Sequence, residues 1–204
     1  MTSRIGDESI IQKRPSRAAL RILVVCSANR GRSPAATYLL QDAAAKLKPR
    51  RKVIVRSAGL SAQPGQEMLA SMRDAMQTQR LPVNEHRSRT FDIHEARRSH
   101  LVITMTEEQR RTVTRSDPTL IPKTFTLLEL ARLVASPQWK PEWNGTDDVV
   151  ARIHRMRPHA AAPAKPEDVN DPLHGGSRMA ASVLGKIDRA VQQIARPLFG
   201  EPRH

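Results

Sequence analysis

Apolar runs and amphipathic stretches alternate along the chain. Residues 21–25 (RILVV) form a short, largely apolar run, which is typical of a strand buried on both faces. Ser33 and Pro34 then predict the start of a helix, because Ser caps helices and Pro fits their first turn. The same pattern predicts further strands at 52–56, 100–104 and 123–126, and helices at 35–48, 68–79, 127–134, 177–194 and from Thr106 onward. Such alternation predicts an α/β fold with a parallel sheet.

The length of 204 residues suits one domain with tails. We expect a polar, loosely ordered leader at 1–18, a domain at 19–196 and a tail at 197–204. Within the domain, 135–166 is polar, punctuated by prolines and carries both tryptophans, which predicts a long loop or a partly helical insertion. No apolar run is long enough for a membrane span and the first twenty residues lack a secretion signal, so we expect a cytoplasmic protein with no membrane partner.

Charge and cysteine content narrow the chemistry. The formal net charge of +14 favours acidic partners such as phosphorylated substrates, although an arginine-rich composition alone explains it. Aromatic residues make up only 3% of the chain and no nucleic-acid-binding signature is present, which argues against nucleic acid as a partner. The single cysteine, Cys26, excludes a cysteine-cluster zinc site, and the seven histidines show no metal-ligand spacing. We therefore expect neither metal nor cofactor.

The segment Cys26-Ser-Ala-Asn-Arg-Gly-Arg-Ser33 follows the first predicted strand. A loop between the carboxyl end of a strand and a helix lies where open α/β sheets bind ligands, and its backbone N–H groups form a nest for an anion. Such a nest favours the thiolate of Cys26, while Arg32 can hold two phosphoryl oxygens and Ser33 can donate to the sulfur. These parts suit attack by sulfur on a phosphoryl group. The alternative is an inert buried cysteine at a strand end.

Several separated motifs resemble the low-molecular-weight protein-tyrosine-phosphatase family over residues 20–195. They are Cys26 and Asn29 with Arg32-Ser33-Pro34, Ser57-Ala58-Gly59, His86-Arg-Ser-Arg89, the strand and Met at 101–106, the segment 125–133, and Asp171-Pro172. The resemblance implies a flavodoxin-like, doubly wound parallel sheet of four strands in the order 2-1-3-4 with helices on both faces. It also implies a metal-independent phosphatase that works through a cysteinyl-phosphate.

Carried over residue by residue, the resemblance makes Cys26 the nucleophile, Arg32 the phosphate-holding cation and Asp171 the general acid and base. The substrate-binding residues would be Ser27, Ala28, Asn29, Arg30, Gly31, Arg32 and Ser33, with Asn29, Ser33, Ser57 and His86 supporting the loop. Asp117-Pro118 competes with Asp171, but it lies between a predicted helix and the fourth strand, so we prefer Asp171. We expect a phosphorylated protein or a small phosphomonoester as partner, and a monomer or weak homodimer.

Four positions depart from the family pattern. Gly31 replaces a second cysteine that forms a protective disulfide in many relatives, so Cys26 should be sensitive to over-oxidation. Ala28 replaces a common Gly and is strained if that position needs a positive φ. Arg30 either favours strongly anionic substrates or points to solvent, and it disfavours a guanidinium-bearing substrate such as phosphoarginine. Leu173 replaces an aromatic residue beside the pocket, which weakens stacking on a phosphotyrosine ring.

Two other functions fit parts of the sequence. Arsenate reduction uses a similar loop, and a version that relies on a small thiol needs no further cysteine; Pro34 and Asp171-Pro172 favour the phosphatase. A non-enzymatic phosphate-binding or phosphoprotein-binding module is the remaining alternative, and the joint presence of nucleophile, arginine and acid argues against it.

Overall fold

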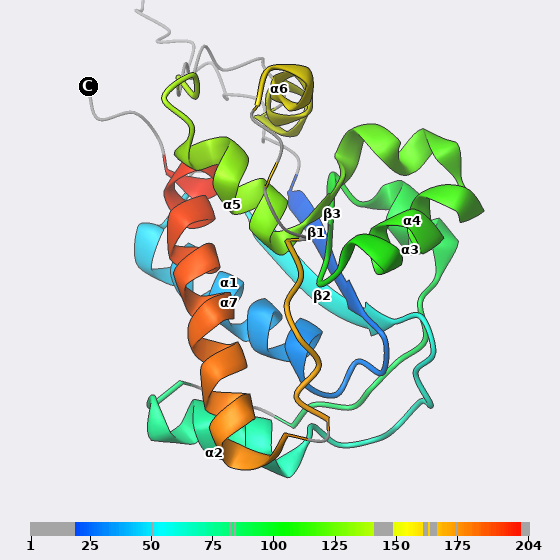
Figure 1. Cartoon of the computed structure of the whole chain (residues 1–204), viewed down its shortest axis with the longest axis vertical. Coiled ribbons are helices and arrows are strands. Elements are labelled where there is room, and N and C mark those ends of the chain that lie inside the picture. Colours follow the sequence, from blue (N-terminus) through cyan, green and yellow to red (C-terminus); the bar gives the residue numbers. More distant parts are fainter. Residues whose placement is uncertain are drawn as a thin grey trace, which may run out of the picture.

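The apolar segments form the four predicted strands, β1 (Leu20–Cys26), β2 (Val53–Gly59), β3 (Leu101–Thr104) and β4 (Thr124–Thr126). In the computed structural model all neighbouring strands are parallel, and their order is β2-β1-β3-β4 (Figure 1). Parallel strands need crossover helices, which bury both faces of the sheet. This arrangement confirms the predicted flavodoxin-like fold and its strand order.

The structure describes residues 19–49, 51–81, 83, 85–140, 149–160, 163, 167–173 and 175–200. The expected leader at 1–18 lies outside the described residues, as do residues 201–204 of the expected tail. None of the helices in the described ranges has both the length and the apolar character needed to cross a bilayer. The cytoplasmic location and the domain boundaries stay predictions.

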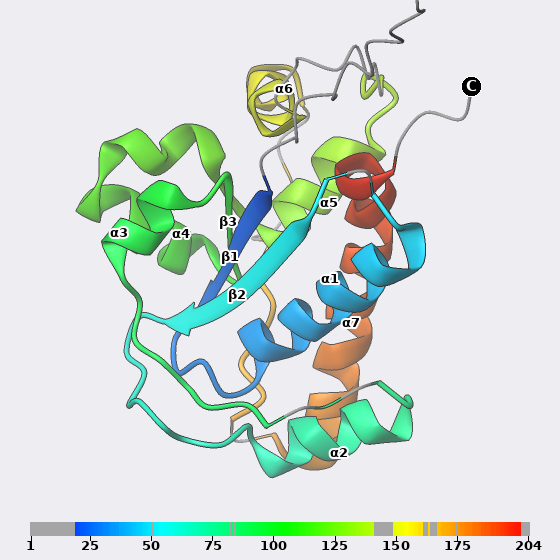
Figure 2. The ribbon, with the colours of Figure 1, turned by 180° about the vertical axis from the view of Figure 1, so that it is seen from behind.

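Helices cover the two faces of the sheet because successive strand residues point to opposite sides. Ile22 and Val24 face the larger core, which is formed with α1 (Arg32–Leu47) and α7 (Gly176–Phe199). Two further helices, α2 (Ala70–Thr78) and α5 (Leu127–Ala135), pack on α7. Leu23 and Val25 face the smaller core, beneath α3 (Ile93–Arg98) and α4 (Glu107–Ser116). Figure 2 shows α1 and α7 on one side of the strands and α3 and α4 on the other.

Side-chain caps fix where two helices begin. The Thr106 hydroxyl accepts a hydrogen bond from the Gln109 amide at the start of α4, and acidic residues follow in its first turn. At the start of α5, Thr126 and Glu129 form a capping box. Both helix starts agree with the sequence prediction, because the residue types that cap helices occur just before each amphipathic pattern.

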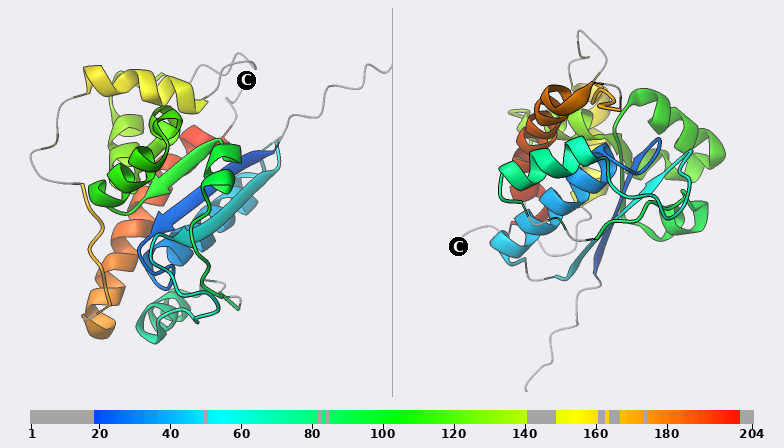
Figure 3. Two further views of the ribbon diagram at one scale, coloured as in Figure 1. Left: turned by 90° about the vertical axis from the view of Figure 1, so that its right-hand side faces the viewer. Right: turned by 90° about the horizontal axis from the view of Figure 1, so that it is seen from below.

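The segment at 135–166 contains two helices in its described part, α6 (Val149–Met156) and the 3-10 helix η2 (Arg157–His159). Arg157 binds Glu129 (2.8 and 3.1 Å) and donates to the carbonyls of Ile121 (2.9 Å) and Thr124 (2.5 Å). The two carbonyls lie at the amino end of β4 and in the 3-10 helix before it, η1 (Pro118–Lys123), and Glu129 lies in the first turn of α5. The segment therefore packs at the amino edge of the sheet, opposite the carboxyl edge where Cys26 lies (Figure 3).

Two details differ from the sequence prediction. The last helix was expected to end near 194, before Pro197, but α7 continues to Phe199. Leu198 and Phe199 are buried, and burying two such side chains stabilises by about 3–6 kcal/mol, which offsets the cost of about 3 kcal/mol for a proline within a helix. The pattern also missed α3 and η1, each only six residues long.

Candidate active site

Cys26 is the last residue of β1, and its side chain is buried at the start of the loop that leads into α1. The segment after β2 lies against this loop: the Leu60 amide donates to the Cys26 carbonyl, and the Ser61 amide donates to the Ser27 carbonyl, both at 2.9 Å. Gly59 permits this approach, because a side-chain carbon there would lie 2.8 Å from the Asn29 amide nitrogen. In the predicted Ser57-Ala58-Gly59 motif, the glycine thus makes room for the loop.

The loop directs hydrogen-bonding groups at the sulfur. The Cys26 Sγ lies 3.0 Å from the Ser33 Oγ, and the Asn29 backbone N–H donates to it at 3.3 Å. Asn29 has φ of 55°, a left-handed conformation that turns its N–H inward. Asparagine tolerates this region better than most residues. Ala28 is not among the residues with positive φ, so the strain considered for it does not arise.

The Asn29 side chain and carbonyl hold the loop in place. Its Nδ2 donates to the Ser33 Oγ (2.9 Å), and its Oδ1 accepts from the Arg89 backbone N–H (3.0 Å). The Asn29 carbonyl lies 2.6 Å from the His86 Nε2, which must donate because a carbonyl only accepts. Burial lowers the pKa of His86, and this bond only partly opposes the shift. His86 therefore acts as a neutral donor at neutral pH.

Arg32 opens α1 with its side chain only 5% exposed. One guanidinium nitrogen donates to the Val169 carbonyl (3.1 Å), and the other lies 3.4 Å from the Ser27 Oγ. The second nitrogen also forms an ion pair with Asp171, whose side chain is 47% exposed. Residues 139 positions apart thus meet beside the loop. The structure brings together the predicted nucleophile, arginine and acid.

Gln109 is a site residue that sequence reasoning missed. It projects from α4, is buried, and its Nε2 donates to the Ser27 Oγ (3.0 Å) while its Oε1 accepts from the Met105 N–H (3.0 Å). The Ser27 hydroxyl is thereby held between Gln109 and Arg32. A glutamine in a polar helix gives no pattern that distinguishes it from a solvated residue, so no sequence signal was available.

The competing Asp117 has a structural role. Its carboxylate caps η1 by accepting from the Thr119 N–H (2.9 Å), and it pairs with Arg97 (2.7 Å). These bonds, with the Arg97 contact foremost, lower the pKa of Asp117 to about 2. Asp117 precedes β4 and so lies toward the amino edge of the sheet, whereas Cys26 ends β1 at the carboxyl edge.

The remaining predicted site residues lie around the loop. The Arg30 Nε donates to the Glu67 carbonyl (2.9 Å), which holds this side chain against the segment before α2. A side-chain carbon at Gly31 would lie 3.3 Å from Leu69 and 3.5 Å from Pro172. Ser57 is buried in β2, and among the described residues no hydrogen bond joins its side chain to the loop. Its supporting role stays a prediction.

Leu173 follows the Asp171-Pro172 pair, and its side chain is 46% exposed. Its backbone N–H donates to the Asp171 Oδ1 (3.2 Å), so it helps to fix the carboxylate. Across the described ranges, no group of three or more His, Cys, Asp or Glu side chains is placed to hold a metal ion. Arg32 thus joins Asp171 to Ser27, the residue next to the buried thiol, so a cation and a partly exposed carboxylate lie beside the loop of Cys26.

Comparisons with known proteins agree with this geometry. The sequence profile described as low molecular weight phosphotyrosine protein phosphatase matches residues 21–139. A relative named probable low molecular weight protein-tyrosine-phosphatase EpsP, from Ralstonia solanacearum, is 28% identical over 134 residues, covering 66% of this chain and 88% of that protein.

Two solved structures illustrate the likeness in fold. The arginine phosphatase YwlE from Geobacillus stearothermophilus has a TM-score of 0.65 at 23% identity, covering 88% of this chain and 92% of its own. The tyrosine phosphatase Wzb from Escherichia coli K30 has a TM-score of 0.62 at 22% identity, covering 88% and 98%. With the profile matching more than half of the sequence, the chain belongs to the low-molecular-weight protein-tyrosine-phosphatase family of metal-independent phosphatases.

Proposed function

We propose that this phosphatase hydrolyses phosphotyrosine in proteins through a cysteinyl-phosphate, with Cys26 as nucleophile and Asp171 as general acid and base. The observation that carries the proposal is the convergence of Cys26, Arg32 and Asp171 on one loop, with the Asn29 N–H and the Ser33 hydroxyl on the sulfur. Nothing else in the described residues combines a nucleophile with a cation and a proton donor in this way.

In the first step the Cys26 sulfur attacks the phosphorus atom, and the bond from phosphorus to the leaving oxygen breaks. The loop N–H groups and Arg32 stabilise the charge on the non-bridging oxygens. Protonated Asp171 gives its proton to the leaving oxygen, which departs as an alcohol or phenol. The partial exposure of Asp171 suits this role, because the leaving group must reach it from the mouth of the site.

In the second step the Asp171 carboxylate takes a proton from water as that water attacks the phosphorus. The bond from sulfur to phosphorus breaks, the thiolate of Cys26 is restored, and inorganic phosphate leaves. The Ser33 hydroxyl and the Asn29 N–H stabilise the departing thiolate, so the same contacts support both steps.

Asp171 must leave its ion pair with Arg32 before it can act as the acid of this cycle. A phosphoryl group in the loop competes with the Asp171 carboxylate for the Arg32 guanidinium, because both present oxygens to the same nitrogen. Binding of substrate should therefore release Asp171 from Arg32, and protonation of the carboxyl group favours that release. The acid becomes available when the substrate occupies the loop.

The family and the residues beside the loop both bear on the class of substrate. The family profile and the name of the Ralstonia relative favour phosphotyrosine. The YwlE neighbours are arginine phosphatases, but the Arg30 side chain at the loop disfavours a second guanidinium in the substrate by like-charge repulsion. Leu173 offers an aliphatic contact where an aromatic side chain would stack on the ring.

Hydrolysis of p-nitrophenyl phosphate by the reduced protein tests the proposal. Cys26→Ser should abolish turnover, and Asp171→Asn should reduce kcat by about 10²–10⁴-fold while inorganic phosphate still binds. Asp117→Asn is the matched control, because it removes a carboxylate from the other Asp-Pro pair and should leave kcat unchanged. Full activity in Asp171→Asn, or its loss in Asp117→Asn instead, would overturn the assignment of the acid.

Turnover on three substrates then separates the candidate activities. We expect activity on a phosphotyrosine peptide to exceed activity on an arginine-phosphorylated protein and on arsenate with a small thiol. Preferred turnover of phosphoarginine would refute the role given to Arg30. Reduction of arsenate without hydrolysis of any phosphomonoester would refute the phosphatase mechanism for this chain.

A further inference from the structure

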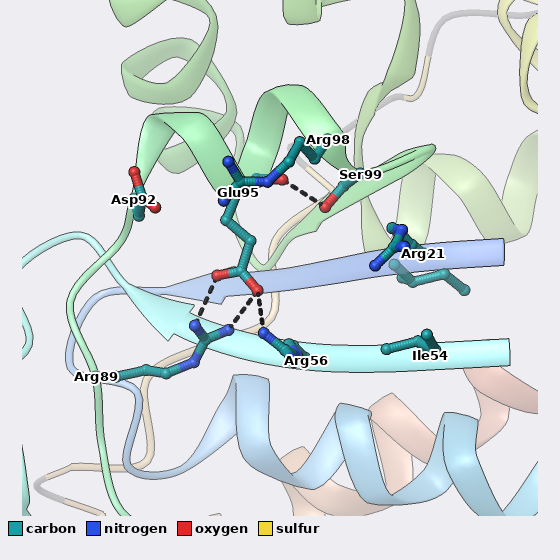
Figure 4. Close-up of a pocket in the computed structure, with 9 residues that line it drawn as sticks. Arg21, Ile54, Arg56, Arg89, Asp92, Glu95, Arg98 and Ser99 are labelled. Carbon is teal, nitrogen blue, oxygen red and sulfur yellow. Dashed lines mark hydrogen bonds and ion pairs between the residues drawn. The ribbon is translucent and has the colours of Figure 1, made fainter. Parts of the chain in front are cut away.

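A second cavity lies on the face of the sheet covered by α3, with a volume of about 190 Å³. Its walls come from the first half of β1, from β2 and from α3, as Figure 4 shows. Arg21, Arg56 and Arg98 contribute to the lining, with Ile54 on β2 and Ser99 at the end of α3. No aromatic residue lines this cavity, so it offers no stacking surface for a nucleobase.

The positive charges of this cavity exceed its negative charges. Arg21 and Arg98 form no ion pair with any described residue, and Arg56 has only a 3.6 Å contact with Glu95. The Glu95 carboxylate is already occupied by a two-point contact with Arg89, at 2.6 and 3.1 Å. Two arginines that line the cavity, Arg21 and Arg98, therefore have no counter-ion among the described residues, and a third, Arg56, is weakly paired.

The one other carboxylate of the cavity is Asp92, which is exposed and caps α3 by accepting from the His94 N–H (2.9 Å). Bringing several guanidinium groups together without matching carboxylates costs electrostatic energy, which a bound anion removes. An arginine also presents a planar fork that matches a tetrahedral oxyanion through two hydrogen bonds.

The cavity is separate from the loop of Cys26. Arg21 and Cys26 are five residues apart on the same strand, which corresponds to about 17 Å at about 3.3 Å per residue. Arg21 points to the side of Leu23, toward α3, and Cys26 belongs to the core on the side of α1. A single phosphoryl group cannot contact both sites.

We propose that this cavity is a second anion site, which binds the phosphoryl group of inorganic phosphate or of a phosphomonoester. Four arginines, Arg21, Arg56, Arg89 and Arg98, supply the charge, and the half-open shape of the cavity beside α3 admits a compact anion from solvent. The proposal does not depend on catalysis at Cys26, because no residue of the cavity belongs to the loop.

The test is a titration of the full-length, isotope-labelled protein with sodium phosphate at constant ionic strength, followed by amide NMR shifts. We expect two independent sets of shifts, one in residues 26–33 and one in residues 54–56 and 92–99. The double substitution Arg21→Gln with Arg98→Gln should weaken phosphate binding at the second set by at least about tenfold and leave the first set in place. Arg189→Gln, which removes an exposed arginine on α7, is the matched control.

Arg32→Ala separates the two proposals, since it should remove the shifts of the loop and keep those at α3. Absence of shifts at 54–56 and 92–99 in the wild type would overturn the second site, whatever the loop does. A parallel titration with a phosphotyrosine peptide distinguishes the sources of the anion. Tighter binding of the peptide than of phosphate at the second set supports a docked phosphomonoester, and equal or weaker binding supports free phosphate.

Discussion

Asn29 has a left-handed backbone conformation, and its side chain forms two hydrogen bonds, one with Ser33 and one with the Arg89 N–H. Two substitutions separate the contribution of the backbone from that of the side chain. In Asn29→Ala the hydrogen bonds from Nδ2 to Ser33 and from the Arg89 N–H to Oδ1 are lost, and the backbone keeps φ near 55° with a Cβ present. In Asn29→Gly the same side-chain bonds are lost, but the left-handed conformation carries no steric cost.

The expected magnitudes follow from these contacts. Loss of one neutral hydrogen bond costs about 1 kcal/mol, and leaving the Arg89 N–H unpaired costs about another 1 kcal/mol or more. Alanine in the left-handed region adds about 1 kcal/mol relative to asparagine or glycine, which both adopt this conformation more readily. The free energy of unfolding should therefore fall by about 3 kcal/mol in Asn29→Ala and about 2 kcal/mol in Asn29→Gly. For a chain of this size these losses correspond to a fall in Tm of roughly 6–12 °C and 4–8 °C.

Thermal unfolding measures these differences, and kcat on p-nitrophenyl phosphate, taken well below the lowered Tm, measures the effect on the site. Both variants should lose at least about tenfold in kcat, because Ser33 loses the donor that orients its hydroxyl toward the sulfur. Equal stability of the Ala and Gly variants would refute the argument from the backbone. Wild-type stability in the Gly variant would refute the argument from the side chain.

Three further predictions concern one ion pair far from the site and two residues beside it. Arg157→Met should lower the free energy of unfolding by about 3 kcal/mol, because it leaves the largely buried Glu129 carboxylate without its ion-pair partner. It should not change kcat, because this pair lies far from the loop of Cys26. Unfolding in urea, with Arg157→Lys for comparison, checks this. His86 has its pKa lowered by folding, so the unfolded state binds more protons just below pH 6.5, and stability should fall as pH falls through that region. His86→Gln should reduce this pH dependence in thermal melts at pH 5 to 8, and the remainder comes from His154, whose pKa burial also lowers. Gly31→Cys should fold, because its Cβ meets only side-chain atoms at 3.3 Å or more. We expect its thiol to form a disulfide with Cys26 under peroxide, so that a thiol restores activity, whereas inactivation of the wild type should be irreversible.

The periodic elements were predictable because each carries its own signal. The strand at Leu20–Cys26 is an apolar run interrupted only by Arg21, and the capping residues Thr106 and Thr126 stand directly before their helices. The short helices Ile93–Arg98 and Pro118–Lys123 carry too few residues to show a period, and η1 contains a proline that normally argues against a helix. Their formation depends on packing in the smaller core, which only the folded chain reveals.

The site was predictable to the extent that its groups are side chains with a recognisable pattern. Cys26, Arg32 and Ser33 lie within one loop, and the strand before it and the helix after it indicate an anion site. The meeting of Arg32 with Asp171 was inferred only through resemblance, because no local pattern joins residues so far apart. The contribution of the Val169 carbonyl gave no sequence signal, since every residue has a backbone carbonyl. Gln109 gave none either, since a glutamine in a polar helix looks like a solvated residue.

Glu95 offers a sharper test of the anion site proposed at α3. Removing its charge should tighten the binding of phosphate, whereas loosening the arginine that it holds should weaken that binding. Its carboxylate lines the cavity and holds the guanidinium of Arg89, so Glu95→Gln removes one negative charge beside Arg56 and loosens Arg89. Loss of the two-point ion pair should lower stability, by about 1 kcal/mol since Arg89 is 39% exposed.

If the cavity binds a phosphoryl anion, the same substitution should tighten the binding of phosphate at residues 54–56 and 92–99, because the anion no longer meets a like charge. A carboxylate at about 6 Å repels a unit negative charge by about 1–3 kcal/mol for effective dielectric constants between those of water and a protein surface, which predicts roughly fivefold or more. Glu95→Asp, which keeps the charge and shortens the side chain, is the control that should destabilise without tightening. Weaker phosphate binding in Glu95→Gln would contradict the charge argument, because it would mean that Glu95 supports the cavity mainly by ordering its arginines, and unchanged shifts at these residues on adding phosphate to either protein would contradict the anion site.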